Sequence, residues 1–220
     1  MIADFDEKTA FFYENGFFLT SELYRMGNLL THYELYKKII NLPGDVVELG
    51  VFKGSSLIQF ATFRELLENE NSRKIIGFDV FGEFPSAQKV ASDVKFVNDW
   101  NNKFEKDFVS KQDIYSSLEH KGISNVELVQ GNIDNTIDEY LFQNPHTRIA
   151  LLHIDTDTYE PAKVGLEKLF DRVVKGGIII FDDYATIEGE TIAVDEFLAD
   201  KDYIISKLPL SHHKPSYIVK

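Results

Sequence analysis

Short apolar runs alternate with longer stretches of helical character through most of the chain. Five of the runs are short enough for buried strands and lie at 45–50, 74–79, 125–130, 148–155 and 177–182. The stretches between them are predicted to be helices, at 55–70, 103–121, 135–143 and 160–174. This alternation predicts an α/β fold in which helices cover both faces of a parallel sheet.

The last part of the chain departs from this alternation. Residues 193–199 are predicted to form a helix, and 203–208 and 215–219 are predicted to form two final strands around a short loop. A closing hairpin places a non-parallel strand on the sheet. We therefore expect a doubly wound, mostly parallel sheet of seven strands whose last strand is antiparallel.

Two regions lie outside the regular pattern. Residues 28–40 have apolar positions at helical spacing before Pro43 and Gly44, and 1–27 are less regular, so we expect a helical cap over 1–43. A larger domain then covers 44–220. Within it, 81–102 shows no clean period, and a loop of this length is usually a lid or a substrate-binding element.

Composition narrows the possible partners. Hydrophobic residues make up 44% of the 220 residues and charged residues 27%, which is ordinary for a globular protein. A net charge of −13 argues against nucleic acid or an anionic membrane as a partner. Without cysteine there is no disulfide, thiolate metal site or cysteine nucleophile. The acidic N-terminus and the absence of a long apolar run lead us to expect a cytoplasmic protein.

The stretch 44–56 reads as a strand, a glycine turn and the start of a helix. Gly50 and Gly54 bracket a turn where the backbone must approach something closely, and Ser55 or its neighbour can cap the helix. Glu48 at the strand end suits a ligand that is cationic or rich in hydroxyls. A solvated acid is the alternative interpretation of Glu48.

Asp79 ends the strand expected beside that of Glu48. An acid at this place can accept hydrogen bonds from ribose hydroxyls. The spacing Gly50-x-x-x-Gly54 differs from the G-x-G-x-x-G of dinucleotide sites, so a pyrophosphate ligand is disfavoured. S-adenosylmethionine carries a ribose and a sulfonium cation but no phosphate, and acid-rich strand ends suit it better.

Four carboxylates form a second group, Asp155 and Asp157 after one strand and Asp182 and Asp183 after the next. Crowded carboxylates require a proton or a cation among them. Oxygen ligands favour a hard divalent ion such as magnesium or calcium, which would activate a hydroxyl for transfer. His153 could supply a nitrogen ligand, or it could be a hydrogen-bonded core residue. The alternative for Asp182 and Asp183 is a solvated turn.

Some further polar and aromatic residues have both a functional and a structural interpretation. His212 and His213, beside Lys214, could bind or deprotonate a substrate, or could be exposed turn residues. Aromatic side chains could pack against a sugar face, or simply fill the core or its rim. These side chains are Trp100, Tyr159 and Tyr184.

Four segments resemble the motifs of the macrocin and mycinamicin type of sugar O-methyltransferase. They are 44–54, 78–85, 151–160 and 176–184, and their order and spacing cover about 45–197. The resemblance implies a class I methyltransferase fold that uses S-adenosylmethionine. It also implies magnesium held by Asp155, Asp182 and Asp183, with Asp155 placed to act as base. We take Asp155 and His153 as candidate catalytic residues.

The same resemblance implies a donor site and a class of acceptor. The donor-site residues would be Glu48, Gly50, Gly54, Ser55, Asp79, Asn132, Ile133 and Asp155. The expected acceptor is a deoxysugar, free, nucleotide-linked or part of a glycan or antibiotic precursor, and the aromatic N-terminus suits a homo-oligomer. Two alternatives stay open. One is an NAD-linked oxidoreductase, which the glycine spacing disfavours, and the other is a catalytically silent nucleoside-binding protein.

Overall fold

The computed structural model describes residues 7–87, 89–104, 108–211 and 214–220. His212 and His213 lie outside these ranges, so their predicted roles stay predictions. Within the described ranges one sheet has the strand order β3-β2-β1-β4-β5-β6. The strands are β1 (Asp45–Leu49), β2 (Ile75–Asp79), β3 (Val126–Gln130), β4 (Ile149–Ile154), β5 (Val173–Phe181) and β6 (Ser216–Val219).

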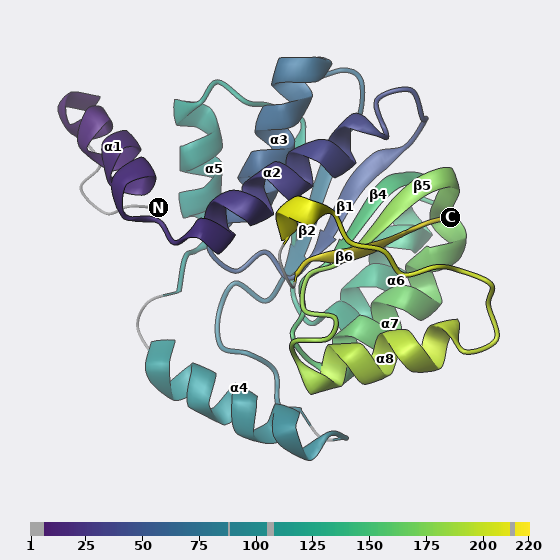
Figure 1. Ribbon diagram of the computed structural model, residues 1–220. Helices are drawn as coiled ribbons and strands as arrows, with labels where there is room; N and C mark the ends of the chain where they lie inside the picture. The colour runs from purple at the N-terminus through teal and green to yellow at the C-terminus, as the bar shows by residue number, and fades with distance from the viewer. Residues whose placement is uncertain (1–6, 88, 105–107, 212–213) are drawn as a thin grey trace.

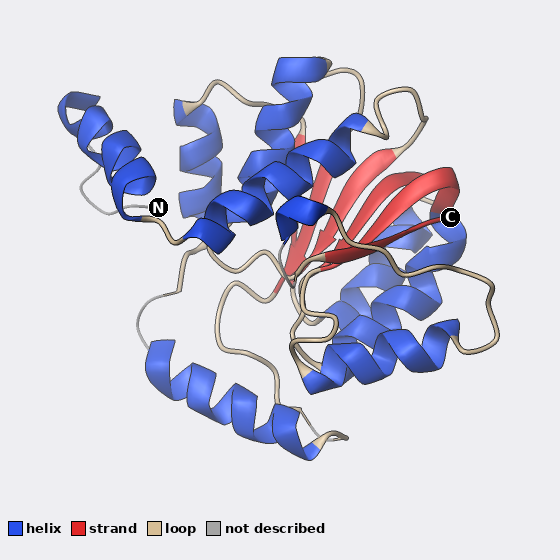
Figure 2. Ribbon diagram, in the orientation of Figure 1, coloured by secondary structure: helices blue, strands red, loops and turns tan. Residues whose placement is uncertain are grey.

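The pairing of the strands confirms the predicted α/β fold. Strands β1 to β5 run parallel to one another, and β6 runs antiparallel to β5 (Figure 2). The chain order reverses between β1 and β4, and a reversal of this kind leaves a crevice at the carboxyl ends of the strands. In the β1 register, Glu48 lies beside Gly77 of β2 and His153 of β4.

The predicted seventh strand is wrong. Residues 203–208 make only an isolated antiparallel bridge, in which the backbone of Ser206 exchanges two 2.8 Å hydrogen bonds with Tyr217. The side chain of Ile204 is 81% exposed, so this apolar run does not bury a continuous face against the sheet. The segment ends at Pro209, which begins a short 3-10 turn, η3 (Pro209–Ser211). In the described part of the chain the sheet therefore has six strands.

Helices cover both faces of the sheet, as predicted (Figure 1). Alternate strand residues face two core clusters, so that Val47 and Leu49 face one and Val46 faces the other. The first cluster is covered by α6 (Ile133–Gln143), α7 (Tyr159–Leu169), the short turn η2 (Phe170–Arg172) and α8 (Glu188–Leu198). The second is covered by α2 (Leu23–Lys37), α3 (Ser55–Leu67) and α5 (Lys111–His120). Glu48 and His153 lie in alternation with first-cluster residues and so point toward α2 and α3.

The predicted lid is more regular than expected. It contains α4 (Ala91–Phe104), where the sequence showed no clean period, and the helix predicted over 103–121 begins only at Lys111. Ser110 and Asp113 form a reciprocal capping box at that point, which fixes the start of α5. The pattern of α4 was obscured because Asp93, a charged residue, is one of its buried positions.

The N-terminal region contains η1 (Glu7–Thr9) and α1 (Ala10–Thr20), which stands away from the sheet (Figure 1). Helix α2 instead contributes Leu35 and Tyr36 to the core, so the division of the chain after residue 43 stays a prediction. In the described ranges, no helix combines the length and the apolar character needed to cross a membrane.

Candidate active site

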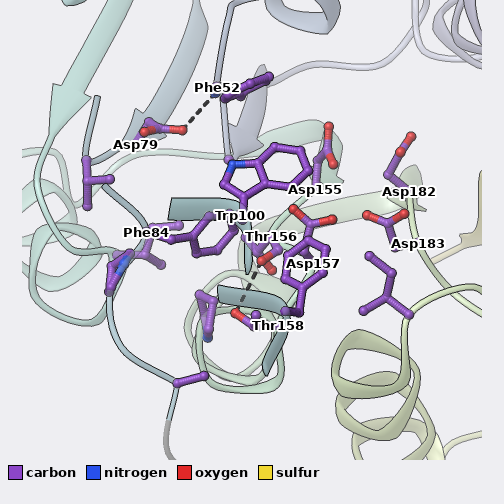
Figure 3. A pocket seen from close by; sticks show the side chains of 18 of the residues that line it. Phe52, Asp79, Phe84, Trp100, Asp155, Thr156, Asp157, Thr158, Asp182 and Asp183 are labelled. Atoms are coloured by element: carbon purple, nitrogen blue, oxygen red, sulfur yellow. Dashed lines mark hydrogen bonds between the residues drawn. The ribbon is translucent and has the colours of Figure 1, made fainter. Parts of the chain in front are cut away.

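A cavity of about 680 Å³ opens at the carboxyl ends of the parallel strands. Figure 3 shows four carboxylates on one side of it, and aromatic side chains together with Asp79 on the other. Its lining includes residues from the turn after β1, the ends of β2, β4 and β5, the start of α6 and the lid. Of the predicted site residues, it includes Gly50, Asp79, Asn132, Ile133, Asp155, Asp182 and Asp183.

The turn after β1 depends on two glycines. Gly50 has φ +86°, and a Cβ there would lie 1.8 Å from the backbone oxygen of Asp155, so only glycine fits. Gly54 has φ +82° and is itself the N-cap of α3, which makes the predicted cap role of Ser55 wrong. Gly50 lines the cavity, whereas Gly54 shapes the turn behind it and Ser55 is exposed.

The carboxylate of Asp79 holds this turn in place. One oxygen accepts hydrogen bonds from the backbone N–H groups of Val51 (2.7 Å) and Phe52 (2.8 Å), the latter drawn in Figure 3. The other oxygen accepts from the N–H of Phe81 at 2.6 Å. Asp79 still lines the cavity, so it joins two loops while leaving acceptor capacity toward a ligand.

The start of α6 provides another part of the cavity wall. Asn132 is the N-cap of this helix, and its side-chain oxygen accepts a 3.0 Å hydrogen bond from the N–H of Asp134. Asn132 and Ile133 both line the cavity, as Gly50 does. They reach the cavity because α6 starts shortly after the end of β3, and their predicted contact with the donor stays a prediction.

The strand ladder brings the predicted carboxylates to one rim. The N–H of Asp155 bonds to Leu49 O, and that of Asp182 bonds to Ile154 O, both at 2.9 Å, so strands β1, β4 and β5 end side by side. One carboxylate oxygen from each of Asp155, Asp182 and Asp183 lies within 4.8 Å of the others. We call these three residues the acid group.

Burial and mutual repulsion control the charges at this rim. Burial raises the pKa of Asp155 well above its usual value, and the charge of Asp182 adds to the rise. Burial also raises the pKa of Asp157, with contributions from the charge of Asp183 and a side-chain hydrogen bond to it. The pKa of Asp183 is raised by burial and by Asp182. Asp157 has a left-handed backbone, φ +59°, and also lines the cavity.

Lys214 supplies the cation that the acid group requires. Its Nζ lies 2.6 Å from Asp183 Oδ1 and 3.3 Å from Asp182 Oδ2. Burial opposes the charged ammonium, but the two carboxylates outweigh it and raise the pKa of Lys214. The sequence indicated Lys214 only as a neighbour of two histidines, because nothing local shows that β6 carries it back to the rim.

His153 and Glu48 lie beneath the rim rather than in the cavity. Both side chains are fully buried, and His153 Nδ1 lies 2.9 Å from Glu48 Oε1. His153 Nε2 lies 3.6 Å from Asp182 Oδ1. Burial opposes a charge on His153, but the nearby carboxylates of Asp182 and Glu48 raise its pKa well above the usual value. Neither His153 nor Glu48 is among the residues that line the cavity.

Helix α2 adds two polar residues that the sequence analysis missed. His32 Nε2 lies 3.8 Å from Asp182 Oδ1, and Asn28 Nδ2 donates to the same oxygen at 3.4 Å. Burial opposes ionisation of Asp182, yet the nearby imidazoles of His153 and His32 hold its pKa well below its usual range. The helical spacing of His32 with the buried Leu35 and Tyr36 was the available signal for its position.

Aromatic side chains form the wall opposite the acid group. The ring of Trp100 lies 5.4 Å from that of Phe52, 5.5 Å from Phe96 and 6.4 Å from Phe84, and all four residues line the cavity (Figure 3). Of the three predicted sugar-packing aromatics, only Trp100 belongs to this wall.

The other two predicted aromatics have structural contacts. Tyr159 is buried at the start of α7, where its hydroxyl donates to Glu196 at 2.6 Å. Tyr184 donates to Asp195 at 2.8 Å, and burial together with this bond raises its pKa. Both lie outside the cavity lining.

Similarity to known proteins agrees with this geometry. A 4'-O-methyltransferase for 8-demethyl-8-(2,3-dimethoxy-alpha-L-rhamnosyl)-tetracenomycin-C from Streptomyces olivaceus is 29% identical over 150 residues, 66% of this chain and 54% of that protein. Demethyldecarbamoylnovobiocin O-methyltransferase from Streptomyces niveus is 28% identical over 168 residues, 74% of this chain and 61% of that protein. The matched region thus spans little more than half of each relative.

Solved structures extend the similarity over nearly the whole fold. The calicheamicin methyltransferase CalS11 is 26% identical with a TM-score of 0.73, covering 99% of this chain and 87% of that one. The O-methyltransferase NovP, at 23% identity, shares the fold with a TM-score of 0.76 over 88% of this chain and 79% of that one. The sequence profile described as Macrocin-O-methyltransferase (TylF) matches residues 24–209. Because this match covers most of the chain, the protein belongs to the macrocin O-methyltransferase family.

Proposed function

We propose that this protein transfers a methyl group from S-adenosylmethionine to a hydroxyl of a sugar that is free, nucleotide-linked or attached to a natural product. The proposal rests on one observation: Gly50, Asp79 and Asn132 line the same cavity as the acid group. The printed names of the relatives refer to a rhamnosyl tetracenomycin and a novobiocin precursor, and CalS11 is described as a TDP-rhamnose 3'-O-methyltransferase. Family membership disfavours the NAD-linked alternative.

The donor would lie along the turn after β1. Asp79 has acceptor capacity left for ribose hydroxyls. Gly50 packs directly against the backbone of Asp155, which would leave space above the turn for a ligand. Asn132 and Ile133 would bound the far side of the nucleoside. When bound, S-adenosylmethionine supplies an electrophilic methyl group.

The acid group fits a hard divalent ion, for which magnesium is our proposal. Its donors are all carboxylate oxygens, and in the structure they already attract the ammonium of Lys214. Asp155, Asp182 and Asp183 would hold the ion. When bound, it lowers the pKa of a coordinated hydroxyl.

A carboxylate in the cavity would accept the proton of the acceptor hydroxyl. Asp155 is our first candidate, and Asp157 is the second because it lines the cavity and its pKa is also raised by burial. Raised pKa values of this kind suit groups that must take up a proton near neutral pH. His153 lies behind Asp182 and would position that residue rather than touch the acceptor.

The experiment is a methyl-transfer screen. Purified protein, S-adenosylmethionine labelled on its methyl group and magnesium are incubated with nucleotide sugars and glycosylated natural products, with and without chelator. We expect a labelled sugar ether that disappears with the chelator. Donor binding without transfer to any sugar would favour the silent nucleoside-binding alternative, and the absence of donor binding by calorimetry would overturn the proposal.

The exposed face of α1 supports the expected homo-oligomer. No residue of α1 is buried, and Phe11, Phe12 and Phe18 are each at least 72% exposed, as is Leu19. A second copy that covered this face would remove a large apolar patch from water. Light scattering after size-exclusion chromatography should show more than one copy, and Phe12→Ser with Phe18→Ser should give the monomer.

A further inference from the structure

Two buried histidines converge on one oxygen of Asp182 beneath the rim. His153 Nε2 lies 3.6 Å and His32 Nε2 3.8 Å from Asp182 Oδ1, and the two imidazole rings are 5.0 Å apart. The three ligand atoms all lie within 4.8 Å of one another, and each residue is buried. His32 comes from α2, His153 from β4 and Asp182 from the end of β5, so three separate elements build the arrangement.

The second nitrogen of each histidine is already held by a side-chain oxygen. His153 Nδ1 lies 2.9 Å from Glu48 Oε1, and His32 Nδ1 lies 3.0 Å from Gln59 Oε1. A ring nitrogen that donates to oxygen leaves the other nitrogen as the lone-pair atom in a neutral imidazole. Metal-binding histidines are held in this way, because the outer hydrogen bond fixes the ring and its tautomer.

The inner nitrogens face the Asp182 carboxylate at ion-pair distance but form no hydrogen bond. The Nε2 atoms of His32 and His153 are buried and make no hydrogen bond to any described residue, and both histidines are at most 2% exposed. The ring of Phe60 packs 5.0 Å from His32 and 5.5 Å from His153 and closes the site from the core side. Buried unpartnered nitrogens are costly, and a shared ligand would satisfy both.

We propose that His32, His153 and Asp182 form a second metal site, for a first-row transition ion such as Zn²⁺, next to the acid group and joined to it through Asp182. Two imidazole nitrogens and one carboxylate oxygen suit such an ion better than magnesium. Ligands at about 2.0–2.1 Å from a tetrahedral ion lie roughly 3.3 Å apart, so small shifts of the side chains complete the site. The ion takes the place of the proton between His153 and Asp182.

The role of this site is to fix Asp182 from behind. Asp182 Oδ1 faces the histidines, while Asp182 Oδ2 faces Lys214 and the acid group. An ion bound to Oδ1 holds the carboxylate plane in one orientation, so that Oδ2 is positioned for a ligand that binds on the cavity side. The inference rests on the contacts of these side chains and stands whether or not the protein methylates sugars.

The test is a titration of chelator-treated protein with Co²⁺, followed by visible absorption, in the presence of excess magnesium to occupy the acid group. We expect one equivalent of Co²⁺ with the intense bands of a low-symmetry site, displaced by Zn²⁺. His32→Gln should weaken Co²⁺ binding by at least about tenfold. The matched control is His146→Gln, at an exposed histidine, which should bind as the wild type does.

Two further measurements keep the result decisive. Gln59→Met keeps all three ligands but removes the bond that orients His32, and it should weaken Co²⁺ binding even if His32→Gln does not fold. Crystals soaked in Zn²⁺ should show an anomalous peak between the two Nε2 atoms and Asp182 Oδ1. Two results would overturn the second site: equal Co²⁺ affinity in the wild type and Gln59→Met, or an anomalous peak only at the acid group. Either result would mean that the two histidines and Asp182 form an internal ion pair without a metal.

Discussion

Asp93 in α4 accepts a 2.8 Å hydrogen bond from the backbone N–H of Tyr159, the first residue of α7. It also accepts from the backbone of Gly189 near the start of α8, where a Cβ would lie 1.9 Å from the Asp93 carboxylate. A single buried carboxylate therefore anchors the lid helix to the positive ends of two core helices. Burial, together with the nearby Glu160 and Glu188, raises the pKa of Asp93.

Asp93→Ala should release the lid helix from the body of the protein. Two buried backbone donors lose their acceptor, which costs about 1–3 kcal/mol for each unsatisfied group. We expect faster hydrogen exchange in α4 with unchanged protection of β4. The control is Ser92→Ala, which removes only the exposed 2.6 Å bond to Glu188 and should exchange almost as the wild type does. Equal protection of α4 in Asp93→Ala and the wild type would contradict the anchor.

Gly50→Ala should abolish donor binding and destabilise the fold. The added methyl group would meet the backbone of Asp155 at 1.8 Å, and φ +86° is strained for alanine. We expect a loss of more than about 2 kcal/mol in the free energy of unfolding, measured in urea. Gly16→Ala is the matched control, because nothing lies within 4 Å of that position in α1 and alanine favours a helix. Wild-type donor affinity in Gly50→Ala would show that the turn can move aside.

Lys214→Met should increase the affinity of the acid group for magnesium. The ammonium lies 2.6 Å from Asp183, so an ion must compete with it or displace it. Without added ion, the same variant should be less stable by about 2 kcal/mol, because the buried carboxylates lose a partner. Calorimetry and thermal melts with and without magnesium measure both effects. Lys175→Met, at an exposed lysine, should change neither, and weaker magnesium binding in Lys214→Met would mean that Lys214 assists the ion.

Asp79→Ala and Asp182→Ala should separate donor binding from turnover. Asp79 holds the turn after β1 through two backbone hydrogen bonds and the loop after β2 through a third, so its loss should weaken S-adenosylmethionine binding by at least about tenfold. Asp182→Ala should largely abolish methyl transfer while leaving donor affinity within a few fold. Calorimetry and single-turnover assays measure the two properties. Parallel losses of both properties in Asp182→Ala would refute the separation.

Tyr36 should make the fold sensitive to alkaline pH. Burial, followed by the 2.7 Å hydrogen bond to Glu68, raises the pKa of its hydroxyl above the ordinary value of 10.0. Above pH 10 the unfolded chain releases this proton while the folded protein keeps it, so stability falls with rising pH, by up to about 1.4 kcal/mol per pH unit. Tyr36→Phe should be less stable at neutral pH but decline less steeply, as urea unfolding across the pH range would show. An equal decline in both proteins would exclude Tyr36 as the cause.

The rim of the sheet was predictable because parallel strands carry their last residues to one edge. Asp155, Asp182 and Asp183 follow buried apolar runs, and the ladder of hydrogen bonds leaves them little freedom to lie elsewhere. The direction of Glu48 and His153 was harder to predict, because a fully buried strand lacks the alternation that shows which face a side chain takes. Both point toward α2 instead of the cavity.

Residues that depend on tertiary packing escaped prediction. His32 reaches Asp182 only because α2 packs across the sheet end, and Lys214 reaches the acid group only because β6 returns antiparallel to β5. Helix α4 was taken for an irregular loop because Asp93, a buried anchor, interrupts its apolar face. The apolar run at 203–208 suggested a strand but forms a single bridge, since apolar content alone does not supply a partner for each backbone group.

The position of β6 in the chain also determines the order in which the rim is assembled. Ribosomes add residues in sequence, so all three carboxylates of the acid group emerge before Lys214 does. Until the last strand docks on β5, a nascent chain holds these acids together without the ammonium of Lys214, and their mutual repulsion works against closing that corner of the sheet. Completion of the rim thus follows translation of the other five strands.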